Sequence, residues 1–373
     1  MAPAKTLNEW MSFCNNPPPG VTAAATCGLD TFGYSRTVTI DHTKTGTVNS
    51  TNFPILFSGT YSFLATVANG GLVQSASGWD IMFTSDAAGN SLLDFEVESY
   101  DATTGTIRAW VRIPTLSVTV DTVIYLWYGK NCVASLANKT GVWDSNFMLV
   151  WHLSNGTVLS AADSTSNNRT GSIFGQTGND MATAAFIAGG AILDGVNNYI
   201  FTPSLGAPPT SMTLSAWVKP NAAGGVIFDE TGTNALNSGW HDSQLEVETN
   251  NTVKSCVWIG SEKCVVAGSG IVYGNWYHMA TRYDQPGATL AGFVNGALGA
   301  SSAATKQYPN TGVQYWNVGG TDTTNGGNSA YGSALIDEVR ISNIARSNSW
   351  LLSEYNNQFS PSTFYTLGVE VAH

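Results

Sequence analysis

Apolar and polar residues alternate along many short runs of this chain, and this alternation limits the fold more than any other feature. In the run TIRAWVRI at 106–113, Ile107 and Val111 fall on one side of the alternation, whereas Arg108 and Arg112 fall on the other. Successive side chains of a strand point to opposite faces, so the pattern predicts a strand with one buried face. Further runs of this kind occupy 34–40, 93–99 and 121–128. Gly, Asn and Asp separate them, which predicts an antiparallel β-sandwich.

The second half of the chain continues the pattern beyond a linker that we place near 131–145. Strands are predicted at 191–193, 212–219, 225–228, 276–283 and 291–294. Asn295-Gly296 predicts a type I′ hairpin turn. Near the C-terminus, Ser347 or Asn348 can cap a short helix at 349–355, and 363–371 predicts a final strand. We therefore expect an all-β protein with an arm at 1–30, β-sandwiches at 31–131 and 142–345, and a C-terminal helix and strand at 346–373.

The composition excludes several classes of protein. Only 11% of the 373 residues are charged, and the formal net charge is −11. An average globular protein has about 25% charged residues. An acidic surface repels phosphate backbones and anionic lipids, so we expect no nucleic acid and no membrane as partner. A β-rich chain with so few charges is typical of proteins exposed outside cells or on virus particles.

The N-terminal sequence has no apolar segment of the kind found in secretory signals. We therefore expect either a signal that was removed or a protein that leaves the cell by lysis, as a phage virion protein does. Trp10 and Phe13 make the arm too apolar to extend freely into water. We expect them to pack on the rest of the chain or on a second copy, which makes a homo-oligomer a candidate assembly.

Five cysteines leave one without a partner. Cys256 and Cys264 flank a predicted hairpin that turns near 260–262, so they are candidates for a cross-strand disulfide. Cys14 and Cys27 bracket a proline-rich loop and form a second candidate pair, which leaves Cys132. The alternative is that all five are reduced, as in a cytoplasmic protein. The five histidines show no ligand spacing, so we expect no zinc site.

Asp94, Glu96 and Glu98 are the strongest enzyme-like signal, because alternate residues of one strand share a face. Paired carboxylates are what glycoside hydrolysis requires. The alternative is a cross-strand ion-pair ladder, with Arg108 opposite Glu98 and Arg112 opposite Asp94. We favour the ladder and therefore a protein that is not an enzyme.

Seven motifs in the second half carry a family resemblance. They are VWHL at 150–153, DSTSNN at 163–168, LDGVNNY at 193–199, LSAWVK at 214–219, WYHMA at 276–280, FVNG at 293–296 and LIDEVRI at 335–341. In this order they resemble the laminin-G-like, concanavalin A-like jelly-roll family of prokaryotic and phage surface proteins. Residues 33–130 resemble the uncharacterised β-domain that often precedes such a module. The resemblance implies a jelly roll that binds glycans, binds proteins or acts as a spacer.

The resemblance also implies a structural calcium ion. Family members often bind one at the loop that corresponds to Asp163, with a contribution from the residue corresponding to Asp337. Calcium takes about six to eight oxygen ligands, and backbone carbonyls can complete the set. The alternative is an Asx-turn at Asp163 and an ion pair between Asp337 and Arg340.

A glycan surface is the remaining candidate site. Jelly-roll lectins use aromatic faces with amide or carboxylate hydrogen bonds, on a concave sheet or at loop tips. The segment NSGWHD has this chemistry, with Asn237, Trp240, His241 and Asp242 as candidate contacts, and Tyr315-Trp316 shares it. The alternative for any one tryptophan is packing in the core.

Together these features predict a non-enzymatic structural or adhesion protein of an exposed surface. We favour a phage virion protein, in a decoration or a tail appendage, that binds a glycan or a surface protein and contacts capsid or tail proteins. A secreted bacterial adhesin or carbohydrate-binding module, extracellular or on the cell surface, is the alternative. A glycoside hydrolase is the second alternative.

Overall fold

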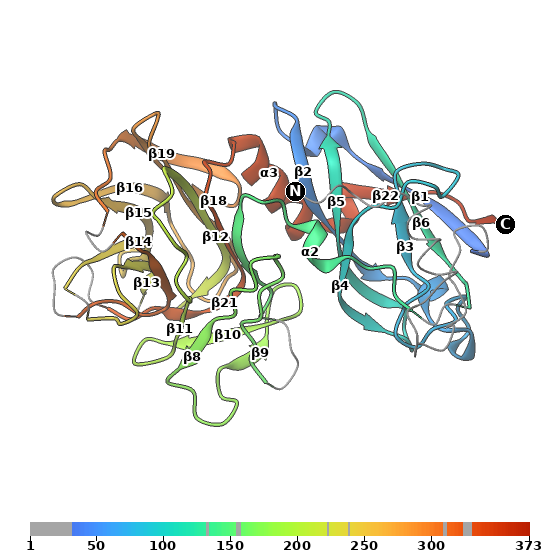
Figure 1. The fold of residues 1–373 in the computed structure, drawn as a ribbon, viewed down its shortest axis with the longest axis horizontal. Coiled ribbons are helices and arrows are strands. Elements are labelled where there is room, and N and C mark those ends of the chain that lie inside the picture. The colour runs from blue at the N-terminus through green and yellow to red at the C-terminus, as the bar shows by residue number, and fades with distance from the viewer. Residues whose placement is uncertain are drawn as a thin grey trace, which may run out of the picture. The chain divides into compact units, whose positions relative to one another are not determined.

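The computed structural model describes residues 32–131, 134–153, 158–221, 224–237, 239–308, 312–323 and 330–373. The chain forms two compact units (Figure 1). Unit 1 contains the residues up to Val142 together with Asn356–His373, and unit 2 is Trp143–Tyr355. The predicted arm at 1–30, with Trp10 and Phe13, lies outside the described residues.

Unit 1 is an antiparallel β-sandwich, as the alternation predicts. One sheet has the order β2(Ser50–Thr60)-β5(Thr106–Leu116)-β4(Phe95–Asp101). The other has the order β22(Tyr365–Leu367)-β1(Tyr34–Ile40)-β6(Thr122–Tyr128)-β3(Met82–Thr84), with β23(Val371–Ala372) also paired to β1. Between the sheets, the ring of Phe83 lies 5.3 Å from that of Phe57 and 5.5 Å from that of Phe95. Short helical segments of unit 1 are η2(His42–Lys44), η3(Ser62–Leu64), η4(Val67–Asn69), α2(Lys139–Val142) and α4(Pro361–Phe364).

The predicted ion-pair ladder between β4 and β5 is half correct. Arg112 pairs with Asp94. The register shifts between Val97 and Ser99, however, so Arg108 lies opposite Ser99 and donates to its Oγ at 3.3 Å. The predicted pairing of Glu98 with Arg108 is therefore wrong, because a β-bulge moves the strand by one position.

The C-terminal residues complete unit 1, whereas the sequence predicts one terminal segment at 346–373. Tyr365–Leu367 pairs with β1, and the predicted strand at 363–371 is interrupted at Gly368. A Cβ at Gly368 would lie 2.1 Å from Thr37 Oγ1, so a larger residue there would require the Thr37 side chain on β1 to move. Asn357 covers the edge of β2, where its Oδ1 accepts from the Leu56 amide at 2.6 Å and its Nδ2 donates to the Leu56 carbonyl at 3.0 Å.

Unit 2 consists of two antiparallel sheets around one hydrophobic core. The first, here called the β12 sheet, has the order β19(Ala297–Ala303)-β18(Thr289–Val294)-β17(Tyr277–Asp284)-β12(Ser211–Pro220)-β21(Ser333–Ser342)-β10(Gly189–Asp194)-β9(Ala182–Ala184), with β7(Phe147–Trp151) paired to β21. The second, the β13 sheet, has the order β16(Glu262–Ser269)-β15(Thr252–Trp258)-β14(His241–Val247)-β13(Gly225–Thr231)-β20(Tyr315–Val318)-β11(Tyr199–Phe201)-β8(Ser172–Phe174). Helix α3(Asn348–Phe359) starts after Ser347, whose Oγ accepts from the Trp350 amide at 3.0 Å.

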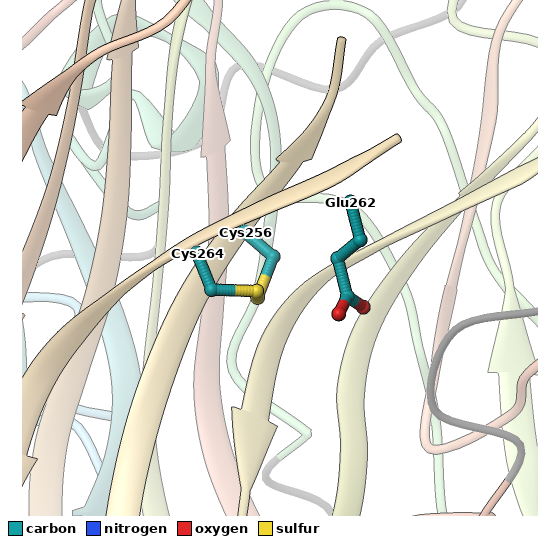
Figure 2. A group of neighbouring side chains, drawn as sticks. All are labelled: Cys256, Glu262 and Cys264. Carbon is teal, nitrogen blue, oxygen red and sulfur yellow. A yellow bond between two sulfur atoms is a disulfide. The ribbon is translucent and has the colours of Figure 1, made fainter. Parts of the chain in front are cut away.

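Two hairpins of unit 2 form as their sequences predict. Asn295 and Gly296 have φ values of 52° and 72°, as a type I′ turn requires. Cys256 on β15 and Cys264 on β16 lie directly opposite one another and form the predicted disulfide, with 4.1 Å between their Cα atoms (Figure 2). Cys14, Cys27 and Cys132 lie outside the described residues. No helix in the described ranges is long and apolar enough to cross a membrane.

Candidate functional site

Two of the residues predicted to bind a glycan, His241 and Asp242, lie on strand β14 and point to opposite faces of its sheet. His241 lies opposite Thr231, whereas Asp242 lies opposite Glu230. Glu230 in turn lies opposite Trp316, a residue of the core. Asp242 therefore faces the core, and its neighbour His241 faces outward, because successive side chains of a strand alternate. A single ligand on one face of the sheet cannot contact both.

The other two predicted residues are more accessible. Asn237 is exposed, and its Oδ1 accepts from the Thr323 amide at 3.0 Å. Trp240 is half-buried, and the centroid of its ring lies 5.5 Å from Lys306 Nζ. Their contact with a glycan stays a prediction. Trp316 is fully buried, so packing in the core is the correct interpretation of that tryptophan.

Lys306 lies inside unit 2 between two carboxylates. Its Nζ is 2.8 Å from Glu230 Oε2 and forms a second ion pair with Asp242, and all three side chains are at most 3% exposed. Gln244 and Gln314 both donate to the Glu230 carboxylate. Burial disfavours the ionised carboxylate and raises the pKa of Glu230 to about 7, although Lys306 opposes this shift.

This buried cluster has the chemistry of an acid–base pair but not the accessibility. A carboxyl group with a raised pKa beside an ionised one is what glycosidases use. Glu230 is completely buried, so no substrate can reach it in this conformation. We therefore interpret the cluster as a structural feature of the sandwich. The sequence predicts no such cluster, and its one signal is that Asp229 and Glu230 continue the apolar strand run at 226–228.

A row of aromatic rings crosses the outer face of the β13 sheet. Phe174 and Tyr199 are a cross-strand pair whose rings stack, with centroids 4.8 Å apart and planes at 8°. The ring centroid of Phe201 lies 6.4 Å from that of Tyr199 and 6.1 Å from that of Tyr315. The ring centroid of Tyr331 lies 6.2 Å from that of Tyr199. We call these five residues the aromatic row. It contains Tyr315, which the sequence analysis named, but not Trp316.

The outward orientation of the aromatic row follows from the register of the sheet. Ile200 pairs with Val318, and both belong to the core. Tyr199 and Phe201, on either side of Ile200, therefore point to the opposite face. Phe174 is 42% exposed, Tyr199, Tyr315 and Tyr331 are half-buried, and Phe201 is buried at 3% exposure.

Asn317 lies beside the aromatic row but is fully buried. It lies opposite Phe201 on the neighbouring strand, and its Nδ2 donates to Asp229 Oδ2 at 3.2 Å. Its Oδ1 is buried and has no hydrogen-bond partner in the described part of the chain. A Cβ at Gly320 would lie 2.8 Å from this Oδ1 and 3.2 Å from the Tyr199 ring, so glycine leaves the acceptor and the ring side by side.

The two residues predicted to bind calcium have other partners. Asp163 Oδ1 accepts from the amides of Val150 and Thr165 at 3.0 and 2.9 Å. Its Oδ2 accepts from Thr165 Oγ1 at 2.8 Å and from the Arg169 amide at 2.7 Å. These donors use the four acceptor positions of the carboxylate, as in the Asx-turn alternative.

Asp337 lies on β21 and accepts from the amide of Ile187 at 2.8 Å through its Oδ2. Arg340, the partner that the alternative gives to Asp337, forms ion pairs with Glu338 and Glu354. Calcium binding by Asp163 and Asp337 stays a prediction.

The two facing antiparallel sheets define unit 2 as a jelly-roll sandwich. Residues 194–351 match the family model described as the concanavalin A-like lectin/glucanases superfamily. Residues 77–152 match a domain of unknown function, DUF2341. The chain therefore carries a concanavalin A-like domain that follows an uncharacterised domain, as the sequence motifs predict. The superfamily comprises both lectins and glucanases, so the match is compatible with binding and with hydrolysis.

Several solved structures are similar to this chain at low sequence identity. Domain 4 of an extracellular GH43 arabinanase from Geobacillus stearothermophilus, solved with arabinotriose, is 20% identical, covers 57% of this chain and 98% of its own, and has a TM-score of 0.38. A pentraxin from Limulus polyphemus is 17% identical, with 41% and 73% covered and a TM-score of 0.34. The CBM40 of a Ruminococcus gnavus sialidase, bound to sialyllactose, is 15% identical, with 40% and 84% covered and a TM-score of 0.32. No curated protein sequence matches the chain.

Proposed function

We propose that unit 2 is a glycan-binding module whose contact surface is the aromatic row. The stacked pair of Phe174 and Tyr199 on the outer face of the β13 sheet is the observation that carries this proposal. The assignment of residues 194–351 to a superfamily of lectins and glucanases supports it.

The chemistry of the surface suits a sugar. The C–H faces of a pyranose pack on flat aromatic rings, and its hydroxyl groups need hydrogen-bond partners close to those rings. Phe174 and Tyr199 supply the ring surface, and the hydroxyl group of Tyr199 can both donate and accept a hydrogen bond. Phe201 is only 3% exposed, so it supports its neighbours, and the ring surface open to a ligand is that of Phe174 and Tyr199.

The proposal is tested by retention on immobilised polysaccharides. A panel of neutral and acidic polysaccharides is used in affinity gels with the full chain, with Phe174→Ala and with Tyr199→Ala. Trp79→Ala is the matched control, because Trp79 in unit 1 is 41% exposed and Phe174 is 42% exposed. We expect at least one polysaccharide to retard the wild type and the control but neither row variant. Equal retardation of all four proteins would contradict the proposal, and retention of none would favour a protein ligand.

The prediction that the protein is not an enzyme is checked on the polysaccharides that retain it. We expect no new reducing ends after prolonged incubation. Release of reducing ends that disappears in Glu98→Gln would instead establish the glycoside hydrolase alternative, with Asp94, Glu96 and Glu98 as its catalytic groups.

We further propose that the module is displayed on an exposed surface. A virion, with capsid or tail proteins as neighbours, is the setting that we favour, and an extracellular or cell-surface adhesin is the alternative. Mass spectrometry of purified particles and of culture supernatant distinguishes these settings.

A further inference from the structure

We propose that Asp41, His42 and Asp121 of unit 1 form a binding site for a divalent transition-metal ion such as Zn²⁺. One ligand atom from each residue lies within 4.8 Å of the other two. The site lies at one end of the β1–β6 pair and is separate from the glycan surface proposed for unit 2.

The pairing of β1 with β6 brings the two carboxylates together. Ile40 and Thr122 are the last pair of this antiparallel ladder. Asp41 directly follows Ile40, and Asp121 directly precedes Thr122, so both aspartates occupy the next position of the same ladder. His42 comes from the short helix η2 that begins there.

Hydrogen bonds orient the three side chains and leave ligand atoms available. Asp121 Oδ1 lies 2.6 Å from His42 Nδ1 and also accepts from the His42 amide at 3.1 Å. Asp41 Oδ1 accepts from the amide and hydroxyl of Thr43 at 2.8 and 2.7 Å. The hydrogen bonds found in the described residues do not involve Oδ2 of either aspartate. This distinguishes the pair from Asp163, whose acceptor positions are all used.

The electrostatics of the cluster favour a cation. Like charges in neighbouring positions of a ladder repel one another, and a divalent ion between them removes that repulsion. Lys44 is close enough to contribute a positive charge at Asp41, which only partly offsets the two carboxylates.

The ligand set selects the class of metal. Imidazole together with carboxylate suits zinc, cobalt or nickel, whereas calcium and magnesium prefer oxygen ligands alone. Three protein ligands leave a fourth zinc position for water. The sequence spacing of the histidines predicted no zinc site. That expectation is revised here, because 79 positions separate His42 from Asp121 and only the strand pairing brings them together.

Calorimetric titration with Zn²⁺ tests the site in the full chain after its free thiols have been alkylated, so that cysteines cannot bind the ion. Co²⁺ is used in parallel, because its visible spectrum reports nitrogen and oxygen ligands. We expect one saturable Zn²⁺ site per chain, and His42→Gln and Asp121→Asn should each weaken it about tenfold or more. Circular dichroism confirms that the variants are folded.

Asp101→Asn is the matched control. Asp101 also accepts from the amide of a threonine two positions further on, Thr103, at 2.8 Å, and it lies in another turn of unit 1. This variant should bind Zn²⁺ as the wild type does. Absence of saturable binding, or equal affinity in His42→Gln, would overturn the proposal. Tighter binding of Ca²⁺ than of Zn²⁺ would overturn the assignment to a transition metal.

Discussion

The partners of a carboxylate decide its role in this protein. Asp163 accepts four hydrogen bonds from its own loop and from β7, and it is 6% exposed. Glu230 is also buried, but it and Asp242 both form ion pairs with Lys306. Both residues are acidic positions in β-rich sequence, and the sequence does not reveal that they are buried or which donors surround them. Each leads to a different prediction.

Replacing Asp163 should destabilise unit 2 without any involvement of calcium. Asp163→Ala leaves buried amides of Val150 and Thr165 unpaired, which should lower the free energy of unfolding by about 1–3 kcal/mol. Asp180→Ala is the control, because this exposed residue accepts from the Thr177 amide at the surface. Denaturant unfolding with and without a chelator provides the measurement. A chelator effect on the wild type that is absent in Asp163→Ala would support the calcium prediction instead.

Glu230 should make the stability of unit 2 depend on pH. Its pKa in the folded state is about 7, above the usual value of 4.5, so the folded state holds a proton that the unfolded state has released between these values. The stability that this proton contributes is complete below pH 4.5 and is lost as the pH rises through about 7. Lys306 and Asp242 are the charged groups that face this carboxyl group, and the charge of Asp229, on the opposite face of the strand, also raises its pKa.

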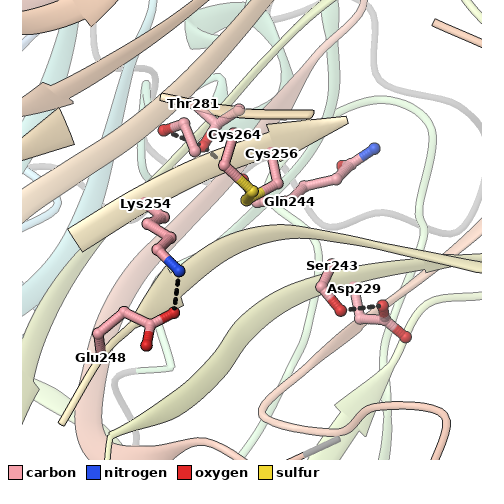
Figure 3. The surroundings of a disulfide bond; sticks show 9 residues. Asp229, Ser243, Gln244, Glu248, Lys254, Cys256, Cys264 and Thr281 are labelled. Carbon is pink, nitrogen blue, oxygen red and sulfur yellow. Dashed lines mark hydrogen bonds and ion pairs between the residues drawn. A yellow bond between two sulfur atoms is a disulfide. The ribbon is translucent and has the colours of Figure 1, made fainter. Parts of the chain in front are cut away.

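The expected result is a decline in the free energy of unfolding as the pH rises from acidic values to above 7, and Glu230→Gln should reduce this decline. The contribution of one group is at most about 1.4 kcal/mol per pH unit. Glu248→Gln is the control, since Glu248 forms a more exposed ion pair with Lys254 at 2.8 Å (Figure 3). A decline of equal slope in Glu230→Gln would show that other groups cause it.

At the scale of elements, local pairing is predictable and register is not. The β15–β16 hairpin and its disulfide follow from two cysteines eight positions apart around a glycine turn. The β4–β5 hairpin was also predicted, but its bulge at Val97–Ser99 was not. The alternation of apolar and polar residues along β4 does not indicate where a bulge occurs. The same limit applies to the aromatic row. Tyr199 and Phe201 alternate visibly in sequence, whereas the partners Phe174 and Tyr315 are set by strand order.

The disulfide should stabilise its hairpin measurably. A disulfide that closes so short a loop lowers the conformational entropy of the unfolded chain, which stabilises the folded state by about 2–3 kcal/mol. The free energy of unfolding of unit 2, measured with a denaturant, should therefore be lower by this amount in Cys256→Ala/Cys264→Ala. Wild-type protein with a reductant should behave like the variant. A reductant effect of similar size on the double variant would show that another thiol is responsible.

At the scale of the whole molecule, the end of the chain belongs to the unit at its beginning. Phe364 and Tyr365 are buried in unit 1, and β22 pairs with β1. The sequence predicts the all-β class, both sandwiches and most strands, because alternation is local. It does not predict this closure, since nothing in residues 356–373 indicates which sheet they join.

Truncation should therefore act on one unit selectively. A chain that ends at Tyr355 loses two buried aromatic residues and the strand pairing of β22, which together should cost unit 1 about 4–6 kcal/mol. Calorimetry should show loss of one unfolding transition, with the other retained. A chain that ends at Gly368 keeps β22 and should retain both transitions. Survival of both transitions in the shorter chain would contradict the assignment of 356–373 to unit 1.

Binding of a glycan by the aromatic row is tested most directly by an equilibrium measurement. Calorimetric titration with an oligosaccharide from the retaining polysaccharide gives the Kd of the wild type, Tyr199→Ala and Trp79→Ala. Loss of one stacking ring should cost about 1.4 kcal/mol, a tenfold rise in Kd. We predict this rise for Tyr199→Ala and an unchanged Kd for Trp79→Ala. Equal Kd values for all three proteins, with Tyr199→Ala fully folded, would contradict the account.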